Sequence, residues 1–356
     1  MWPIDLPLVD PFVVATGSRV TAHNAYTRIT LAGGAVGYGE MAPFPEVGGE
    51  DRAACLETAA RLAVMVLGRT VREWKAVGQL FMETAAAHPA ARCGLETAMV
   101  DALCRQLGIP LWGYWGAADV RERTTDITIP ICDVERTVAL GEAWYRRGFR
   151  LIKTKVGTDV DQDVRRMEAL HTRLPGLAFI PDANQGFTRD ECRYFVKQAR
   201  RCGASIVLLE QPLAKDDLDG MAALRRDLGV PIAADESIRS LQDAREVIRS
   251  GAADFVNIKI TKSGLLAAME IMACARTAGL RLMVGGMVET RIAMGCSFGL
   301  VLGAGGFEVL DLDTPLLLAH DPVVGGYRYS GPALHPWTGA GLDLSADVPP
   351  AAMAFE

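Results

Sequence analysis

The sequence predicts an α/β protein in which a closed (β/α)₇β barrel follows a smaller α+β capping domain. Short apolar segments rich in β-branched residues recur every 22 to 30 residues from about residue 127 onward. An amphipathic stretch long enough for a helix follows each segment except the last, which indicates alternating strands and helices. Strands that are apolar on both faces are typical of a parallel sheet covered by helices. An open, doubly wound parallel sheet is the alternative on this pattern alone.

Eight strands are expected in the barrel. They cover residues 127–132, 150–155, 177–182, 205–210, 230–235, 254–259, 280–285 and 307–312. Seven helices separate them, for example over 133–148 and 264–279. Because no helical pattern follows the last strand, the barrel is expected to lack the eighth helix of a regular (β/α)₈ barrel.

Residues 1–115 do not follow this rhythm and are predicted to form the capping domain. Two strand-like segments precede two helical stretches there, at residues 11–17, 25–40, 50–68 and 90–108. The barrel is assigned to residues 116–316. The tail, residues 317–356, contains many prolines and glycines, and we expect it to pack on the capping domain and complete it.

Composition and charge narrow the class of partner. The formal net charge is only −6 and the basic residues are scattered, which argues against nucleic acid and against an anionic membrane as partners. The N-terminus lacks the apolar core of a signal peptide, and no apolar run is long enough to span a membrane. The eight cysteines include no C-x-x-C pair and are expected to be reduced thiols. A cytoplasmic protein with a small-molecule partner is therefore predicted, and a homo-oligomer is compatible with the sequence.

Ionisable residues stand at the end of nearly every predicted strand. In barrel enzymes the reacting groups lie at the carboxyl ends of the strands, so charges at these positions require an explanation. A single one of them is readily explained as a loop carboxylate or a salt-bridged lysine, whereas the joint pattern indicates a functional site. The residues are Lys153, Lys155, Asp182, Glu210, Asp235, Lys259, Glu289, Asp311 and Asp313.

Three carboxylates favour a metal ion. Asp182, Glu210 and Asp235 end three adjacent strands, so they are expected to meet at one rim, where their mutual repulsion requires a cation. Oxygen ligands without histidine or cysteine favour Mg²⁺, with Mn²⁺ as a substitute, over zinc. The alternative is that each carboxylate pairs separately with an arginine or lysine.

The lysines suggest proton transfer. Strands two and six are four positions apart in a ring of eight, so Lys155 is expected to face Lys259 across the barrel mouth. One amine on each face of a carbon suits removal of a proton from one face and its return to the other. Lys153 shares a face with Lys155, and repulsion between them is expected to lower their pKa values. Asp311 and Asp313 would hold a cationic end of the substrate, or they form a solvated loop pair.

The motifs that carry these residues resemble those of a known family. They are KTK at 153–155, PDANQG at 181–186, LEQPL at 209–213, ADES at 234–237, NIKITKSG at 257–264, GGMVET at 285–290 and DLD at 311–313. In order and spacing the chain resembles the muconate-lactonising subgroup of the enolase superfamily, and the DLD motif makes it similar to the dipeptide epimerases. The resemblance implies a modified TIM barrel, (β/α)₇β, with a capping domain.

The resemblance also implies roles for individual residues. Lys155 and Lys259 would be the catalytic acid and base, and Lys153 would neutralise the substrate carboxylate. Mg²⁺, one ion per subunit, would bind Asp182, Glu210 and Asp235. The remaining implied contacts are Asp311 and Asp313 with the substrate ammonium group, Thr128 and Met287 with the substrate, and Glu236 and Lys262 as supporting residues.

The predicted reaction is a 1,1-proton transfer at the α-carbon of the C-terminal residue of L-Ala-L-X dipeptides. The loops at 15–22 and 44–51 would cap the mouth, with Val14, Phe44 and Val47 favouring a hydrophobic X. Arg19 suggests L-Ala-D/L-Glu epimerisation instead, although the acidic side chains of the second loop, Glu46, Glu50 and Asp51, disfavour a glutamate. Further alternatives are o-succinylbenzoate synthase, N-acylamino acid racemase and, from a different class, a non-catalytic Mg²⁺-binding protein.

Overall fold

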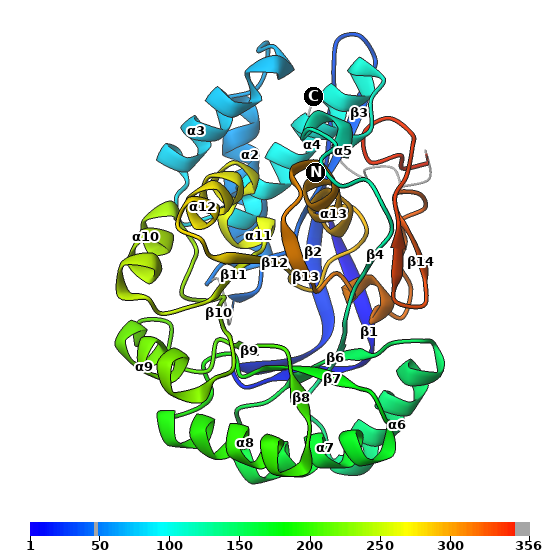
Figure 1. Ribbon diagram of the computed structural model, residues 1–356. Coiled ribbons are helices and arrows are strands. Elements are labelled where there is room, and N and C mark those ends of the chain that lie inside the picture. The colour runs from blue at the N-terminus through cyan, green and yellow to red at the C-terminus, as the bar shows by residue number, and fades with distance from the viewer. Residues whose placement is uncertain (46–48, 346–356) are drawn as a thin grey trace.

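One parallel sheet of eight principal strands forms the centre of the protein (Figure 1). The computed structural model describes residues 1–45 and 49–345. The strands are β5 (Ile127–Ile129), β6 (Leu151–Lys155), β7 (Ala178–Asp182), β9 (Leu209–Glu210), β10 (Ile232–Ala234), β11 (Phe255–Ile258), β12 (Arg281–Val284) and β13 (Phe307–Leu310). They lie side by side in chain order, and the short β8 (Ser205–Ile206) pairs with β7. The fourth predicted strand, 205–210, is thus split into β8 and β9.

The two edge strands of this sheet meet and close the barrel. The Asp126 backbone N–H donates to the Leu310 carbonyl at 3.0 Å, and the Leu312 N–H donates to Thr125 Oγ1 at 2.8 Å. Inside the barrel an apolar layer formed by side chains such as Ile180, Ala233 and Phe255 is buried. Ile180 lies two residues before Asp182 on the same face of its strand, so the charged groups at the strand ends rest on this apolar layer.

Helices cover the outside of the sheet. They are α6 (Val134–Arg146), α7 (Val160–Arg173), α8 (Arg189–Cys202), α9 (Leu218–Leu228), α10 (Leu241–Ser250), α12 (Leu265–Thr277) and α13 (Ala293–Ala304), with a short α11 (Ile260–Ser263) before α12. Several begin at a side chain that accepts a backbone N–H, for example Asp133 before α6 and Thr188 before α8. In the described part of the chain, the only helix after β13 is the 3₁₀ helix η2 (Thr314–Leu316). The predicted (β/α)₇β barrel is therefore confirmed.

The N-terminal region forms a cap with its own antiparallel sheet. The sheet consists of β1 (Trp2–Val14), β2 (Gly17–Thr30) and β3 (Val36–Met41), and the helices are α2 (Arg52–Val64), η1 (Val71–Glu73), α3 (Trp74–Thr84), α4 (Pro89–Leu107) and α5 (Leu111–Tyr114). β1 starts well before the predicted residue 11, because it is an edge strand of this sheet and an edge strand tolerates its prolines. α4 packs so closely on β3 that a Cβ at Gly39 would lie 1.9 Å from the Gly94 carbonyl.

The tail contacts both the cap and the barrel. Its strand β14 (Arg328–Ser330) pairs with β15 (Ala333–His335), and β15 pairs with β4 (Arg123–Thr124), in a second antiparallel sheet. The Trp112 indole donates to the Trp337 carbonyl at 2.7 Å, and the Leu342 N–H donates to Asp101 at 2.7 Å. The boundaries at residues 115 and 316 stay predictions. None of the described helices combines the length and apolar character needed to cross a membrane.

Candidate active site

A small cavity lies at the carboxyl ends of the barrel strands, beneath the cap. The residues that line it come from both parts of the protein: Phe12, Val14 and Phe44 from the cap, and Thr128, Lys153, Lys155, Asn184, Lys259, Gly286, Met287, Val288, Asp311 and Thr314 from the barrel. The structure therefore brings both predicted catalytic lysines and four of the six predicted substrate-binding residues to one cavity. β6 and β11 are four positions apart in the sheet, so the lysines approach the cavity from opposite sides.

The tip of the β1–β2 hairpin covers one side of this mouth. The Ile131 backbone N–H donates to the Val13 carbonyl at 2.9 Å. The Ala15 side chain rests on the loops after β6 and β7, where a Cβ added to Gly186 would lie 2.8 Å from the Ala15 Cβ. Glycine at this position therefore lets the hairpin descend onto the barrel. In the second predicted loop, Glu46 and Val47 lie outside the described residues.

Carboxylates surround the two lysines of β6. Lys153 Nζ lies 2.6 Å from Asp311, 2.9 Å from Glu210 and 3.1 Å from Asp182. Lys155 Nζ lies 2.7 Å from Asp182 Oδ2 and donates to Asn184 Oδ1 at 3.2 Å. The two ammonium groups that share one face of a buried strand are thus held there by anions on the neighbouring strands.

Lys259 and Lys262 share one carboxylate. Lys259 Nζ lies 2.6 Å from Asp235 Oδ2, and Lys262 Nζ lies 2.6 Å from Asp235 Oδ1. Lys262 also donates to the Asp235 and Asn257 carbonyls, at 2.5 and 3.1 Å. Lys262 therefore fixes both the side chain and the backbone of Asp235, which agrees with a supporting position.

These ion pairs shift the pKa values of the lysines and carboxylates in the site. Burial alone would lower the pKa of Lys153 and Lys259, but the carboxylates outweigh it and hold both pKa values above the ordinary range. Burial and the Asp182 charge raise the pKa of Glu210 to about 8. Lys259 and Lys262 overcome the effect of burial and hold the pKa of Asp235 well below its usual range. The expected lowering of the lysine pKa by mutual repulsion is therefore wrong for Lys153, because the anions dominate.

The three carboxylates predicted to bind metal stand on adjacent strands. Asp182 is the register partner of Glu210, and Glu210 is the partner of Ala233, two residues before Asp235. None of the described residues that line the cavity is a histidine or a cysteine, so the donors suit a hard cation such as Mg²⁺. The buried Glu210 Oε2 lies 2.9 Å from the Lys153 ammonium group, so a metal ion bound at this oxygen would share it with Lys153. The ion pairs with lysines also compensate the negative charge of these three carboxylates, as the alternative to a metal ion requires.

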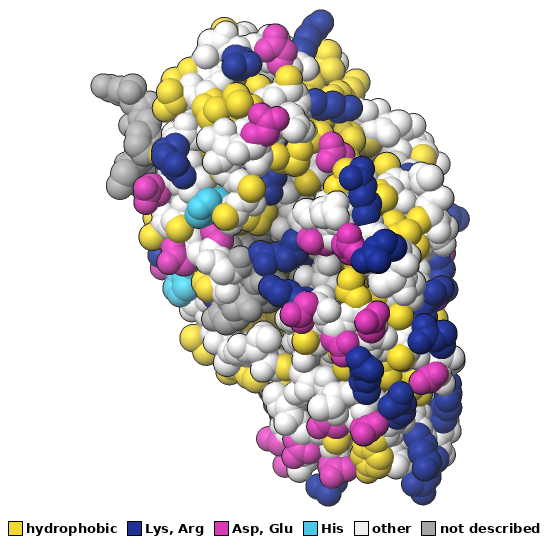
Figure 2. Space-filling view, turned by 90° about the vertical axis from the view of Figure 1, so that its left-hand side faces the viewer, with side chains coloured by type: hydrophobic (Ala, Val, Ile, Leu, Met, Phe, Trp, Pro, Cys, Tyr) yellow, Lys and Arg dark blue, Asp and Glu magenta, His cyan; other side chains and the backbone are white. Residues whose placement is uncertain are grey.

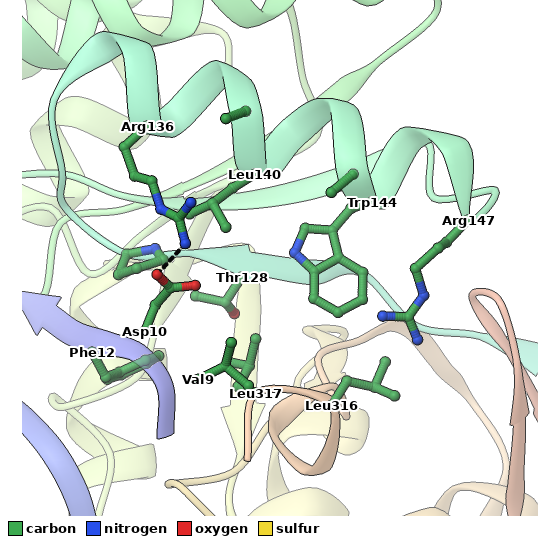
Figure 3. Close-up of a pocket in the computed structure, with 13 residues that line it drawn as sticks. Val9, Asp10, Phe12, Thr128, Arg136, Leu140, Trp144, Arg147, Leu316 and Leu317 are labelled. Carbon is green, nitrogen blue, oxygen red and sulfur yellow. Dashed lines mark hydrogen bonds and ion pairs between the residues drawn. The ribbon is translucent and has the colours of Figure 1, made fainter. Parts of the chain in front are cut away.

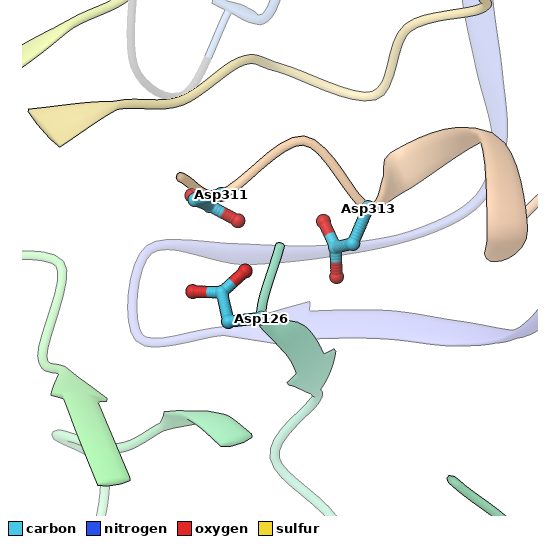
Figure 4. Close-up of side chains that lie close together, drawn as sticks. All are labelled: Asp126, Asp311 and Asp313. Atoms are coloured by element: carbon cyan, nitrogen blue, oxygen red, sulfur yellow. The ribbon is translucent and has the colours of Figure 1, made fainter. Parts of the chain in front are cut away.

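Three aspartates gather where β5 meets β13. Asp126, Asp311 and Asp313 place one oxygen each within 4.8 Å of the others (Figure 4). The Thr128 backbone N–H donates to Asp313 Oδ2 at 2.5 Å. Asp126 was not predicted as a site residue. Its signal is its place two residues before Thr128, which puts it on the same inward face of the strand.

The sequence did not identify two further residues that support the site, Asn184 and Arg166, because only the fold shows their contacts. Asn184 occurs in the PDANQG motif, but only the fold shows that it has a positive φ of 41° and joins Lys155 to Glu236. Arg166, on α7, is buried and donates to the Lys155 and Pro130 carbonyls, both at 2.8 Å. It therefore ties the ends of β5 and β6 together from below the site. Nothing in the sequence distinguishes it from the exposed Arg165.

Arg19 and Met287 differ in their distance from the cavity. Met287 lines it, and its backbone N–H donates to Glu289 at 3.0 Å. Arg19 lies on β2 opposite Phe12, and its guanidinium stands 4.1 Å from the centre of the Phe44 ring. It is not among the residues that line the cavity, so Phe44, rather than Arg19, meets the substrate space.

Two of several larger cavities in the described part of the chain lie near this site. A groove of about 330 Å³ between α6 and the cap shares Phe12 and Thr128 with the site, and an Arg136–Asp10 ion pair borders it (Figure 3). The view from the side of α9 and α10 shows the surface hollowed, with Lys and Arg side chains gathered there (Figure 2). A cavity of about 640 Å³ between the α3–α4 connection and these helices is lined by charged residues that include Glu236 and Lys262. Neither cavity contains the two predicted catalytic lysines.

Known proteins resemble this chain over nearly its whole length. Residues 4–116 match the model described as mandelate racemase/muconate lactonizing enzyme, N-terminal domain, and residues 136–349 match the model described as enolase C-terminal domain-like. An aromatic dipeptide epimerase of Herpetosiphon aurantiacus is 39% identical, with 93% of each chain covered. An L-Ala-D/L-amino acid epimerase of Populus trichocarpa is 38% identical, with 95% of this chain and 81% of the relative covered.

A solved structure shows the same similarity in three dimensions. The dipeptide epimerase of Enterococcus faecalis, complexed with Mg and the dipeptide L-Leu-L-Tyr, superposes with a TM-score of 0.92 at 29% identity. The superposition covers 96% of this chain and 97% of that one.

Proposed function

The chain belongs to the mandelate racemase/muconate lactonizing enzyme family of the enolase superfamily, and on this premise we propose that it is a Mg²⁺-dependent dipeptide epimerase. The reaction is a 1,1-proton transfer at the α-carbon of the C-terminal residue of the dipeptide. One observation carries the proposal. A single cavity is lined by two lysines from opposite sides of the barrel and, at its β5–β13 end, by Asp311, which belongs to a cluster of three aspartates.

The two lysines exchange the α-proton. Lys155 meets one face of the α-carbon and Lys259 meets the other, so a neutral lysine accepts the proton and a charged lysine returns it from the opposite side. Lys153 stays charged among Asp311, Glu210 and Asp182 and provides positive charge beside the substrate carboxylate. Asp311 and Asp313 bind the substrate ammonium group.

Asp182, Glu210 and Asp235 would hold Mg²⁺. When it is bound, the ion supplies positive charge that polarises the substrate carboxylate and makes the α-proton more acidic. Because these three carboxylates now pair with Lys153, Lys155 and Lys259, occupancy by a divalent cation would draw their charge away from the lysines. The pKa of Lys259, which the carboxylates hold above its ordinary range, would then move down, toward the range that acid and base catalysis requires.

The cap favours a hydrophobic side chain on the second residue. Phe12, Val14 and Phe44 present apolar surface to the cavity. The relative whose name specifies aromatic dipeptides supports this preference. L-Ala-D/L-Glu epimerisation through Arg19 is the second candidate, and the position of Arg19 against Phe44, outside the cavity lining, disfavours it. N-acyl substrates would leave the aspartate cluster without a cation.

We also propose that the protein acts in the cytoplasm. All eight cysteines are free, and five of them are buried, which suits a reducing compartment.

Exchange of α-protons with solvent tests the proposal. The protein is incubated with Mg²⁺ and a library of L-Ala-L-X dipeptides in D₂O, with N-succinyl and N-acetyl amino acids and o-succinylbenzoate precursors as separate arms, and mass spectrometry follows deuterium uptake. We expect uptake in dipeptides with aromatic or aliphatic X. Turnover of the N-acyl or succinyl arms without any dipeptide exchange contradicts the proposal.

A further inference from the structure

The aspartate cluster contains one more carboxylate than the proposed function uses. Asp126 precedes β5, whereas Asp311 and Asp313 follow β13, and the closure of the barrel brings them together across 185 residues of chain (Figure 4). In Figure 4 the Asp126 carboxylate points toward the other two. All three residues are buried, and Asp126 has no exposed surface.

The hydrogen bonds in this cluster are incomplete. Asp311 Oδ2 accepts from Lys153 at 2.6 Å, and Asp313 Oδ2 accepts from the Thr128 N–H. Both oxygens of Asp126 and Oδ1 of Asp313 are buried without a hydrogen-bond partner among the described residues. Three acceptor atoms of this buried cluster therefore have no donor among the described residues.

Two other buried carboxylates of the described chain are fully bonded. Asp101, equally buried, accepts from the Tyr38 and Leu342 backbone N–H groups and from Arg105. Glu40 accepts from Asn24, Thr290 and the Ala293 N–H. Several further buried carboxylates leave one oxygen without a hydrogen bond from the described residues, whereas Asp126 leaves both. Since an unbonded buried carboxylate costs free energy, Asp126 is the least satisfied of them.

The cluster is also short of positive charge. Lys153 is the one ammonium group of the described chain in contact with it, and Lys153 is shared with Asp182 and Glu210. Burial and the charges of Asp311 and Asp313 raise the pKa of Asp126 well above its ordinary value. A cation that enters this space would relieve both the missing donors and the missing charge.

We propose that Asp126 is a third binding carboxylate for the substrate's primary ammonium group. This inference rests on the proposed function and extends it. A primary ammonium group has three N–H donors, and Asp126, Asp311 and Asp313 offer one acceptor to each. The ammonium group enters from the cavity past Asp311 and Thr128, which line it. The site therefore selects an unsubstituted amine. An inorganic cation is the other species that the same chemistry would attract.

Stepwise methylation of the substrate amine tests how many carboxylates of the wild-type protein accept an N–H from it. The ligands are L-Ala-α-aminoisobutyrate, which has no α-proton to remove, and its N-methyl, N,N-dimethyl and N-acetyl forms, titrated calorimetrically with Mg²⁺ present. If three carboxylates each accept one N–H, the first methyl group already weakens binding by about tenfold. Equal affinity of the amine and N-methyl ligands overturns the proposal, because two carboxylates need only two donors.

Asp126→Asn provides the matched variant. We expect it to bind the free amine at least about tenfold more weakly, with the weak binding of the N-acetyl ligand unchanged. We also expect it to be no less stable than the wild type, because a buried unpaired carboxylate is removed. Unchanged affinity for the free amine overturns the proposal, and the methylation series decides if the variant does not fold.

A titration with metal alone separates the two sources of cation. Mg²⁺, K⁺ or Na⁺ that binds the wild type in excess of one equivalent, with this excess lost in Asp126→Asn, assigns the cluster to an inorganic ion and overturns the proposal. If the wild type exchanges dipeptide protons but Asp126→Asn binds normally, only this inference fails. If the wild type neither exchanges nor binds any dipeptide, the proposed function fails and this inference fails with it.

Discussion

The two ends of the active-site mouth balance their charges in different ways. At the lysine end, formed by β6 to β11, each carboxylate lies against at least one lysine, and Asp235 contacts two. At the aspartate end, where β5 meets β13, three carboxylates lie together with a single lysine contact, at Asp311. The same barrel rim is therefore balanced on one side and short of cations on the other.

This difference indicates how the site separates two tasks. A balanced set of ion pairs can exchange partners when a cation and a substrate carboxylate arrive, so it suits proton transfer between groups whose charge changes. An end that lacks positive charge binds a cation and keeps it, so it suits recognition. Substitutions at the two ends should therefore impair proton transfer and substrate binding separately.

The largest effect is expected from Lys155→Ala at the lysine end. Loss of one base slows α-proton exchange from one epimer of the dipeptide by about a thousandfold, while Lys259 still removes the proton of the other epimer. Deuterium uptake measured separately for the two epimers checks this, and the exposed Lys197→Ala is the control. Equal loss for both epimers would mean that Lys155 acts in a step common to both directions.

Chelation of divalent metal is expected to come next. Treatment with EDTA should reduce exchange about a hundredfold or more, because the charge developing on the substrate carboxylate is then stabilised by lysines alone. Added Mg²⁺ should restore the rate, and Asp235→Asn should resist this restoration. Full activity after chelation would show that the lysines suffice and that the carboxylates serve only as their partners.

Arg166→Met tests the support beneath the lysine end. It removes the donors to the Lys155 and Pro130 carbonyls and leaves Asp163 as an uncompensated buried charge. We expect the free energy of unfolding to fall by about 3 kcal/mol, measured by urea denaturation. The neighbouring Arg165→Met, whose side chain is exposed, serves as the control and should change it by less than about 0.5 kcal/mol. Similar losses in both variants would contradict the assignment.

The smallest effect is expected from Asp313→Asn at the aspartate end. One binding carboxylate is lost while Asp311 and the lysines remain, so KM for the dipeptide should rise about tenfold with little change in kcat. Steady-state kinetics on both epimers measure this split. A fall in kcat at constant KM would mean that the aspartate end takes part in proton transfer and does not serve recognition alone.

Much of the lysine end was predictable because its signals are local. The alternation of strand side chains puts Lys153 and Lys155 on one face, and the order of strands puts Asp182, Glu210 and Asp235 on one rim. The same period could have identified Asp126, two residues before Thr128. It was missed because a single aspartate before a strand is also an ordinary loop residue.

The sequence by itself determined the strand and helix rhythm, the barrel without a final helix, and the positions of charge along each strand. These follow from periodicities of two and about 3.6 residues, which each segment carries alone. Only the tertiary structure decided which charges compensate one another, how the β1–β2 hairpin rests on Gly186, and that Asp126 meets Asp313. These contacts join residues far apart in the chain, and they form only when the barrel closes and excludes water from the groups it buries.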